Sequence, residues 1–307
     1  MNTPSNAVPE FSSHSQPVAP AAVSPARVMY WSVRRELWEN RSIYIVPLIA
    51  AGIFLLAHLI SVVFLRRHAD TAWRPGSAQA GDAFATHYEI AAALIMGTAL
   101  IVGIFYSLDA LYGERRDRSV LFWKSLPVSD LTTVLSKLTV PFIILPLLSF
   151  AITVATQFIM LLLSSALLLG SGVNLSALWT GASFFHVSLV LLYHLLTVHG
   201  LWYAPIYGWL LLVSAWAPRA PFLWAFMPPF VICGLEKIAF NTTHCLDLLK
   251  YRLSGPNAPE PQGPGMDYMA HLIPQHFFTQ PGLWTGMLVA AIFVALAVRL
   301  RRYQGPI

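Results

Sequence analysis

The stretch Ile43–Leu65 reads IYIVPLIAAGIFLLAHLISVVFL and contains no charged side chain. A helix rises about 1.5 Å per residue, so about 20 such residues cover the roughly 30 Å hydrocarbon core of a bilayer. The core of a water-soluble protein does not need an apolar run of this length. The stretch therefore predicts a membrane-spanning helix, and it decides the fold class.

Five further apolar runs follow along the chain, so we expect an all-α polytopic membrane protein with six transmembrane helices. The runs are Tyr88–Tyr112, Val140–Leu169, Ser183–Ala217, Pro221–Phe240 and Leu283–Val298.

The run Ser183–Ala217 is too long for one simple span and is interrupted by Gly200 and Pro205. Either it crosses the membrane once, near residues 200–217, after an apolar elbow or a kinked helix extension, or it crosses twice with a tight turn near Gly200. Two crossings would make seven spans and move the Arg-rich C-terminus to the outside. We therefore expect a single crossing.

Hydrophobic residues make up 56% of the 307 residues and charged residues only 11%. A soluble domain carries roughly 25% charged residues, so the composition excludes an ordinary soluble domain. The net charge of +5 could suggest nucleic acid as a partner. However, the basic residues flank the apolar runs and form no basic stripe interleaved with aromatic side chains. The charge indicates membrane topology, and no nucleic-acid partner is expected.

The distribution of Lys and Arg orients the spans, because cytoplasmic loops are enriched in these residues. Most of the 19 basic residues lie before the first span, between the second and third spans, or after the last span. With six spans these three segments fall on one side, so we expect both termini in the cytoplasm. Residues 66–87 and 241–280 are then outer loops, and the second contains a Pro/Gly-rich cluster.

Residues 1–25 are rich in Ala, Pro and Ser and lack the apolar core of a signal peptide, so we expect a disordered cytoplasmic tail. Residues 26–307 then form one transmembrane domain. Its first segment, Ala26–Ser42, predicts an amphipathic helix, because apolar side chains recur every four residues from Met29 to Leu37. Such a helix either lies in the membrane interface or leads into the first span as a solvated helix.

The connection between the second and third spans, Tyr112–Ser129, reads YGERRDRSVLFWKSLPVS. A charged patch is followed by the apolar patch Leu121–Trp123 and by a turn that contains Pro127. A short helix here would present aromatic side chains to a groove on another protein, since aromatic residues and arginine anchor many interfaces. Alternatively, the segment is an interfacial loop whose basic side chains reach into water. The residues alone leave both interpretations open.

This stretch resembles the first cytoplasmic loop of the permease subunits of type-two ABC exporters. In that family a Glu begins a short coupling helix, and a Leu-Pro-Val-Ser-like turn leads into the third span. The matching residues are Glu114, Leu126, Pro127, Val128 and Ser129. The six spans, an interfacial N-terminal helix and a long outer loop before the last span also agree with the family. The Pro-rich tail and the larger outer loops depart from it, which leaves the transported substrate open.

The resemblance implies that the chain is the membrane permease of an ATP-driven exporter in the bacterial inner membrane, and that it is not itself an enzyme. Two copies, or this chain and a related permease, would form the pathway above a dimer of separate ATPase subunits. Those subunits would bind ATP and Mg²⁺, and no cofactor is expected on this chain. The sequence agrees, because it contains no Gly-Lys dipeptide and hence no GxxxxGK[ST] phosphate-binding loop.

Within this family the segment Glu114–Lys124 is expected to form one coupling helix that docks on the ATPase. The candidate contact residues are Glu114, Arg115, Arg116, Arg118, Leu121, Phe122 and Trp123. Their apolar and aromatic members would fill a groove, and their charged members would set the register of docking.

Three polar residues are candidates for a transport pathway, because polar groups in spans are costly. Gln157 lies in the third span, and Glu236 and Lys237 lie near the outer end of the fifth. Alternatively, Gln157 forms an ordinary interhelical hydrogen bond and the other two mark the membrane boundary. The histidines have no HExxH spacing, so no metal or haem site is expected. A disulfide between Cys233 and Cys245 is not expected either.

Two other classes of function compete with a transporter subunit. A polytopic membrane enzyme would need a catalytic set, but the sequence has no GxSxG, no HExxH and no paired acidic motif inside the spans. A noncatalytic membrane assembly or sensor protein would explain the same hydropathy. It would not explain the block from Glu114 to Ser129.

Overall fold

The computed structural model describes residues 24–67, 78–125, 128–169, 184–255 and 277–305. Within these ranges the chain forms helices joined by short connections and contains no strand. Five of the helices are long and apolar enough to cross a membrane, and the number is six if a bent pair of helices counts as one span. The expected all-α architecture is confirmed for the described residues, and these apolar helices are consistent with an integral membrane protein. The expected tail falls almost entirely outside the described residues.

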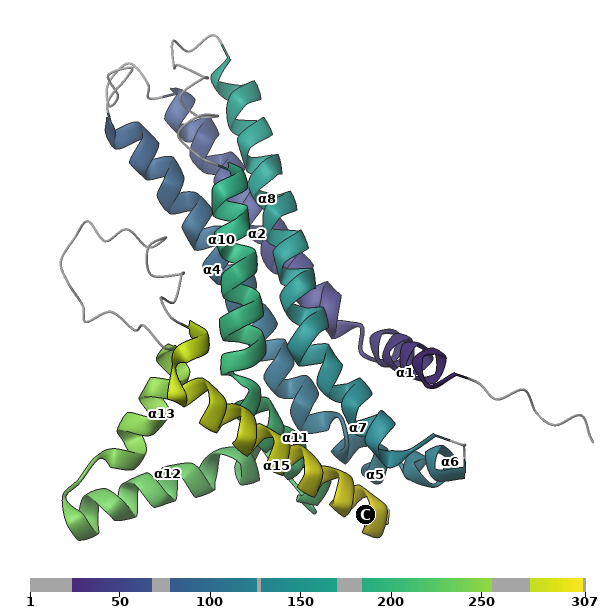
Figure 1. The fold of residues 1–307 in the computed structure, drawn as a ribbon. Helices are drawn as coiled ribbons and strands as arrows, with labels where there is room; N and C mark the ends of the chain where they lie inside the picture. The colour runs from purple at the N-terminus through teal and green to yellow at the C-terminus, as the bar shows by residue number, and fades with distance from the viewer. Residues whose placement is uncertain (1–23, 68–77, 126–127, 170–183, 256–276, 306–307) are drawn as a thin grey trace, which may run out of the picture.

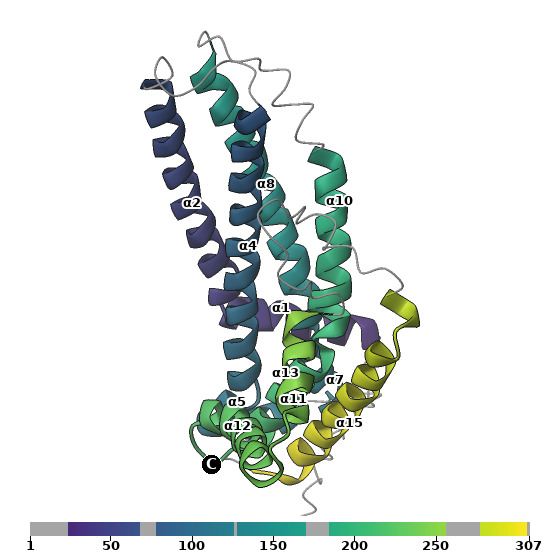
Figure 2. The same cartoon turned by 90° about the vertical axis from the view of Figure 1, so that its left-hand side faces the viewer.

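Three long helices form the body of the bundle and run side by side (Figures 1 and 2). They are α2 (Ser42–Arg67), α4 (Ala78–Asp109) and α8 (Leu145–Leu168). Each of the three packs against the other two. Ala51, Ile95 and Ile152 meet in a buried cluster between them, and we call this cluster the apolar layer.

The third span begins earlier than the apolar run at Val140 indicates. Helix α7 (Asp130–Thr139) starts at the Ser129 cap, whose hydroxyl oxygen accepts a hydrogen bond from the Thr132 amide at 3.0 Å. A π-helical stretch, η1 (Val140–Ile144), joins α7 to α8. The stretch contains a proline, which has no N–H to donate, and a π turn is one way for a helix to continue past such a residue. Residues 130–139, which precede the predicted third span, are therefore helical and continue into it.

The long run Ser183–Ala217 forms one bent helical path. It consists of α10 (Phe184–His194), the π-helical η2 (Leu195–Trp202) and α11 (Ala204–Trp216). The helix pair that ends at Trp202 and resumes at Ala204 is bent by 47°. Gly200 lies inside η2, so the segment has a bend in place of the tight turn that two crossings require.

The predicted amphipathic helix before the first span is confirmed as α1 (Pro25–Glu39), with Ser24 as its N-terminal cap. In Figure 1 α1 lies at a steep angle to the bundle, beside the end of the bundle at which α2 begins. Its Glu36 side chain is buried, and Leu37 packs against a core cluster. Trp31 and Trp38 are exposed. The helix therefore attaches to the bundle by one face and presents aromatic side chains on another.

The segment after the fifth predicted span begins with a helix, so the expectation of a loop from residue 241 is wrong there. Helix α12 (Pro221–Phe240) ends at Asn241, whose φ of 51° lets the chain turn into α13 (His244–Ser254). The remainder of the expected loop, residues 256–276, lies outside the described part of the chain.

The corner between α12 and α13 is held by two interactions. Cys233 and Cys245 form a disulfide with a Cα–Cα separation of 5.2 Å, so the expectation that they stay unpaired is wrong. Glu236 accepts hydrogen bonds from the backbone amides of His244 and Cys245, each at 2.8 Å. Its carboxylate therefore satisfies donors that the first turn of α13 leaves free.

The last helix, α15 (Pro281–Tyr303), follows a short 3₁₀ turn, η3 (Phe277–Thr279), and packs along α11. Gly208 makes this close approach possible. A Cβ atom at this position would lie 3.3 Å from the Ala290 carbonyl oxygen, which is tighter than an ordinary contact. The C-terminal end of α15 thereby comes to the same end of the bundle as α1 and α7 (Figure 1).

Candidate functional site

The segment predicted as one coupling helix is two short helices. They are α5 (Tyr112–Arg116) and α6 (Ser119–Ser125). Between them Arg118 adopts a left-handed φ of 59°, which a continuous right-handed helix cannot contain. The expectation of a single helix over Glu114–Lys124 is therefore wrong. The segment consists of two short helices joined by a turn at Arg118.

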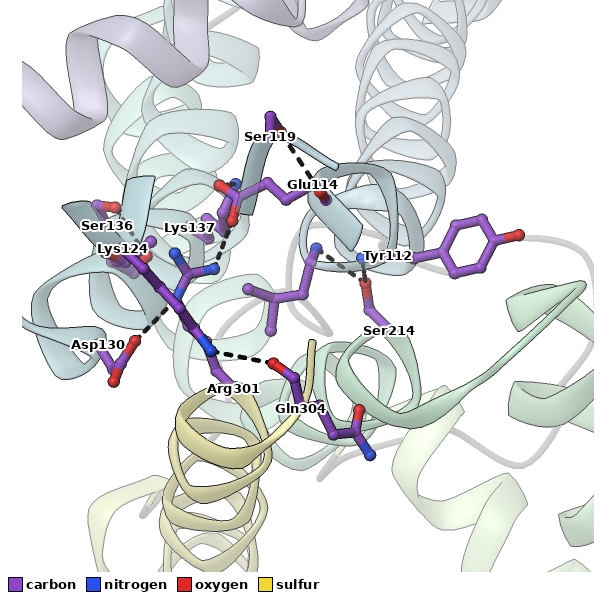
Figure 3. A network of polar contacts seen from close by, with 12 residues as sticks. Tyr112, Glu114, Ser119, Lys124, Asp130, Ser136, Lys137, Ser214, Arg301 and Gln304 are labelled. Atoms are coloured by element: carbon purple, nitrogen blue, oxygen red, sulfur yellow. Dashed lines mark hydrogen bonds and ion pairs between the residues drawn. The ribbon is translucent and has the colours of Figure 1, made fainter. Parts of the chain in front are cut away.

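Glu114, in α5, points into the protein and is 8% exposed. Its carboxylate lies 3.1 Å from the Lys137 ammonium of α7 and 3.4 Å from the Arg35 guanidinium of α1. It also pairs closely with the Arg301 guanidinium of α15 (Figure 3). One carboxylate therefore contacts cations from three other helices.

Glu36, in α1, forms the second centre of the same network. Its carboxylate lies 2.9 Å from the Lys137 ammonium and 2.7 Å from the Arg35 guanidinium. The Tyr106 hydroxyl of α4 donates a hydrogen bond to its other oxygen at 2.9 Å. Burial alone would raise the pKa of Glu36, but Lys137 and Arg35 outweigh burial and hold the pKa below its usual value.

Asp130 completes the network at the start of α7, where its carboxylate lies 3.2 Å from the Arg301 guanidinium. We call the buried and partly buried members of the connected set the charge junction; they are Arg35, Glu36, Glu114, Asp130, Lys137 and Arg301. The exposed Glu39 also pairs with Arg35, at 3.5 Å, but lies outside this buried set. Its three carboxylates balance its three cations. Balanced pairing is what makes buried charges tolerable, because unpaired charge is costly away from water. The junction ties α1, α5, α7 and α15 together at one end of the bundle.

The pKa of Glu36 predicts how stability depends on pH. A carboxylate whose folded pKa is lowered stabilises the protein above its unfolded pKa, and this contribution is lost as pH falls through the folded pKa. The thermal midpoint of the wild type should therefore exceed that of Glu36→Gln at neutral pH, and the difference should shrink on acidification below about pH 4. Thermal unfolding of both proteins in detergent at several pH values measures this difference in thermal midpoint. A difference that grows on acidification would contradict the assignment.

Helix α6 presents an apolar face outward. Leu121 and Phe122 are each 59% exposed. Trp123 is partly covered, because the Arg35 guanidinium lies 3.8 Å from the centre of its ring. Lys124 donates hydrogen bonds to the backbone carbonyls of Arg302 and Gln304, at the end of α15. The helix is therefore held against α1 and α15 while two large apolar side chains face away from the fold.

Of the remaining predicted coupling residues, Arg115 binds another part of the same chain and Arg116 lies at the surface. Arg115 donates hydrogen bonds to the backbone carbonyls of Ala215 and Ala217, which lie at the C-terminal end of α11. Arg116 is exposed and pairs with Asp109 and Asp117. Of the predicted set, the structure places Leu121, Phe122, Arg116 and Arg118 at the surface, whereas Glu114 and Arg115 bind other parts of the same chain.

The three candidate pathway residues lie on two elements, Gln157 on α8 and the other two on α12. Gln157 is buried within α8, and its side-chain amide donates a hydrogen bond to the Tyr88 carbonyl of α4 at 3.3 Å. Glu236 accepts backbone hydrogen bonds at the corner between α12 and α13, and the neighbouring Lys237 is exposed. In the described part of the chain no group of three or more His, Cys, Asp or Glu side chains could hold a metal ion.

Comparison with known proteins gives no assignment. No family model matches the chain, and no similar curated protein or solved structure is found. The charge junction and α6 are therefore the features from which we infer a function.

The charge junction itself was missed by the sequence reasoning, except for Glu114. Lys137 counted only as one of the basic residues between the second and third predicted spans, and Glu36 was not singled out. The pair that they form is separated by 101 residues, so no local pattern joins them. One signal was available: Glu36 lies seven residues after Met29 and three after Val33, which places it on the apolar face of α1, and a charge on such a face predicts a partner.

Proposed function

We propose that this protein is the membrane permease subunit of an ATP-driven ABC exporter. The observation that carries the proposal is the α5–α6 segment, which exposes Leu121 and Phe122 on one side and anchors Glu114 in the charge junction on the other. An element that receives force from a partner needs an exposed contact face and a rigid attachment to the spans. The α5–α6 segment has both properties, and the resemblance of its sequence to the coupling loop of type-two exporters supports the same role.

The charge junction supplies a physical route for the coupling. A displacement of α6 moves α5, and Glu114 then pulls on Lys137 of α7, which continues through η1 into α8. Arg301 carries the displacement to α15, and Arg35 carries it to α1. ATP and Mg²⁺ would be held by the separate ATPase subunits. A second copy of this chain, or a related permease, would complete the pathway in the bacterial inner membrane.

The proposal is tested by reconstitution. The chain purified alone should hydrolyse no ATP, and it should co-purify as a dimer with an ABC ATPase expressed from the same gene neighbourhood. Vesicles that contain both subunits should export cargo only when ATP is present. Transport by this chain without an ATPase partner would refute the proposal.

A topology experiment tests the orientation that coupling requires. Since the two cysteines form a disulfide, single cysteines can be introduced without competing thiols. A membrane-impermeant thiol reagent added outside cells should label cysteines within 257–262, which lie outside the described residues, and should miss those within 115–124. Labelling of residues 303–307 from outside would contradict the placement of the C-terminus in the cytoplasm and favour seven crossings.

A further inference from the structure

One side of α1 carries aromatic and basic side chains that lie away from the bundle. Its members recur at i, i+3, i+4, i+7 and i+11, which places them on the same side of a helix. They are Arg27, Tyr30, Trp31, Arg34 and Trp38. Four of the five are exposed, and Arg34 is partly buried. We call this set the outer face of α1.

The opposite side of α1 faces the charge junction. Glu36 lies about two and a half turns after Arg27, which places it on the far side of the helix, and its carboxylate is buried in the junction. Glu39 is the other acidic residue of α1, and it pairs with Arg35 at 3.5 Å. The outer face therefore carries positive charge and no carboxylate to balance it.

The arginines of the outer face have hydrogen-bond donors to spare. The Arg34 guanidinium lies 5.0 Å from the centre of the Trp31 ring and 4.6 Å from that of Trp38. Such cation–π contacts use the flat side of a guanidinium and leave its N–H edge free. Within the described residues, the side chains of Arg34 and Arg27 form no hydrogen bond and no ion pair. A guanidinium with a free edge is well suited to bind phosphate through two parallel hydrogen bonds.

The outer face also lies where the apolar surface of the bundle begins. Helix α1 runs at a steep angle to the bundle, beside the end at which α2 starts (Figure 1). The exposed apolar side chains of α2 begin at Ile45 and Val46, within about two turns of the end of α1. Tryptophan and tyrosine are enriched at the membrane–water interface, at the level of the lipid headgroups. The position and the composition of the outer face therefore fit a headgroup layer.

We propose that the outer face of α1 binds anionic phospholipid. Arg27 and Arg34 hold headgroup phosphates, and Trp31 and Trp38 lie in the interface beside them. Charge complementarity selects the class of lipid, because a zwitterionic headgroup carries its own cation whereas an anionic headgroup balances the arginines. Since Glu36 on the other side of the same helix belongs to the charge junction, bound lipid also restrains the junction. The proposal requires only that the chain lies in a bilayer, so it does not rest on the ABC assignment.

Native mass spectrometry of the full chain tests the proposal in micelles that contain phosphatidylglycerol and phosphatidylcholine. The wild type should retain phosphatidylglycerol in preference. Arg27→Gln/Arg34→Gln should lower the apparent affinity for this lipid at least about fivefold, which is the contribution of one arginine at an anionic surface. Absence of a preference in the wild type would overturn the proposal.

The charge-matched control is Arg299→Gln/Arg302→Gln, at the C-terminal end of α15. Both arginines are exposed, and no tryptophan lies within two turns of either. This double variant removes the same charge from the same end of the bundle, so it should lose less affinity for phosphatidylglycerol than the α1 variant does. Equal losses in the two double variants would mean that general attraction between charges replaces a site on α1, and they would refute the proposal.

Thermal unfolding in nanodiscs separates lipid binding from damage to the fold. A ligand that binds only the folded protein raises its thermal midpoint. Replacing phosphatidylcholine with phosphatidylglycerol should therefore raise the midpoint of the wild type, and the rise should shrink in Arg27→Gln/Arg34→Gln and at high salt. The rise is compared within each protein, so a lower starting midpoint of the variant does not affect the result. A rise of equal size in both proteins would contradict the assignment of the lipid to the outer face.

Discussion

Replacing Lys137 with methionine is expected to destabilise the protein by about 3–5 kcal/mol, which is the range for removing one partner of a buried ion pair. The Lys137 ammonium lies 2.9 Å from the Glu36 carboxylate and 3.1 Å from that of Glu114, and the side chain is only 3% exposed. Without it, the charge junction holds three carboxylates and two cations. The excess negative charge stays buried, because both carboxylates are fixed by other contacts.

The measurement is the thermal midpoint of the purified protein in detergent, together with the yield of folded protein. Lys124→Met is the matched control. The ammonium of Lys124 is exposed and donates only to the backbone carbonyls of Arg302 and Gln304, so little change is expected. The double variant Lys137→Met/Glu36→Gln should recover part of the lost stability, because it restores equal numbers of buried positive and negative charges. Additive losses in the double variant would show that charge balance is not the cause.

The spans could be predicted from sequence because their signal is local and strong. The run Ile43–Leu65 needs no partner to be recognised, since the bilayer rather than another segment of the chain determines its length. The run Ser183–Ala217 was harder. Its glycine and proline predicted a break, but a break can be a turn or a bend. Backbone hydrogen bonds decide between the two: the Tyr203 amide bonds the Val198 carbonyl and keeps the path helical up to the bend.

The candidate site was predictable only in part, because its chemistry depends on long-range pairing. Glu114 was selected correctly as a special residue, yet its place in the sequence suggested an exposed charge. The structure instead pairs it with Arg301, which is 187 residues away. The disulfide was missed for a similar reason. The spacing of Cys233 and Cys245 fits many arrangements, and only the turn at Asn241 brings the two sulfur atoms together.

The sequence pattern also does not predict the break between α5 and α6. The charged block 114–118 and the apolar run 120–123 are compatible with a continuous helix. The chain breaks because two parts of the segment have separate attachments. Glu114 is fixed in the charge junction, and Lys124 is fixed at the end of α15. The left-handed Arg118 connects these attachments, and the break leaves Leu121 and Phe122 on the outer side of α6.

Substitution of Phe122 by alanine is expected to weaken binding of the proposed ATPase by about 2 kcal/mol or more, which is roughly a thirtyfold rise in Kd. Phe122 is 59% exposed, so its loss should cost the isolated chain little stability. A partner that covers the ring would bury a large apolar surface, and central aromatic anchors dominate such interfaces. Leu121→Ala should act in the same direction. Trp123→Ala is a less specific probe, because it also removes the contact of α6 with Arg35.

The measurement is co-purification and titration of the ATPase with each variant, alongside ATP-dependent transport in vesicles. Phe240→Ala is the matched control, because Phe240 is 75% exposed but lies at the C-terminal end of α12, on a different element from α6. Arg118→Ala should reduce the affinity for the ATPase less than Phe122→Ala does, since charges at the rim of an interface act mainly on the association rate. The reduction should become smaller as the salt concentration is raised. If Phe122→Ala binds the ATPase and supports transport like the wild type, α6 is a solvent-exposed connector. The charge junction would then hold the helices together without transmitting force from a partner.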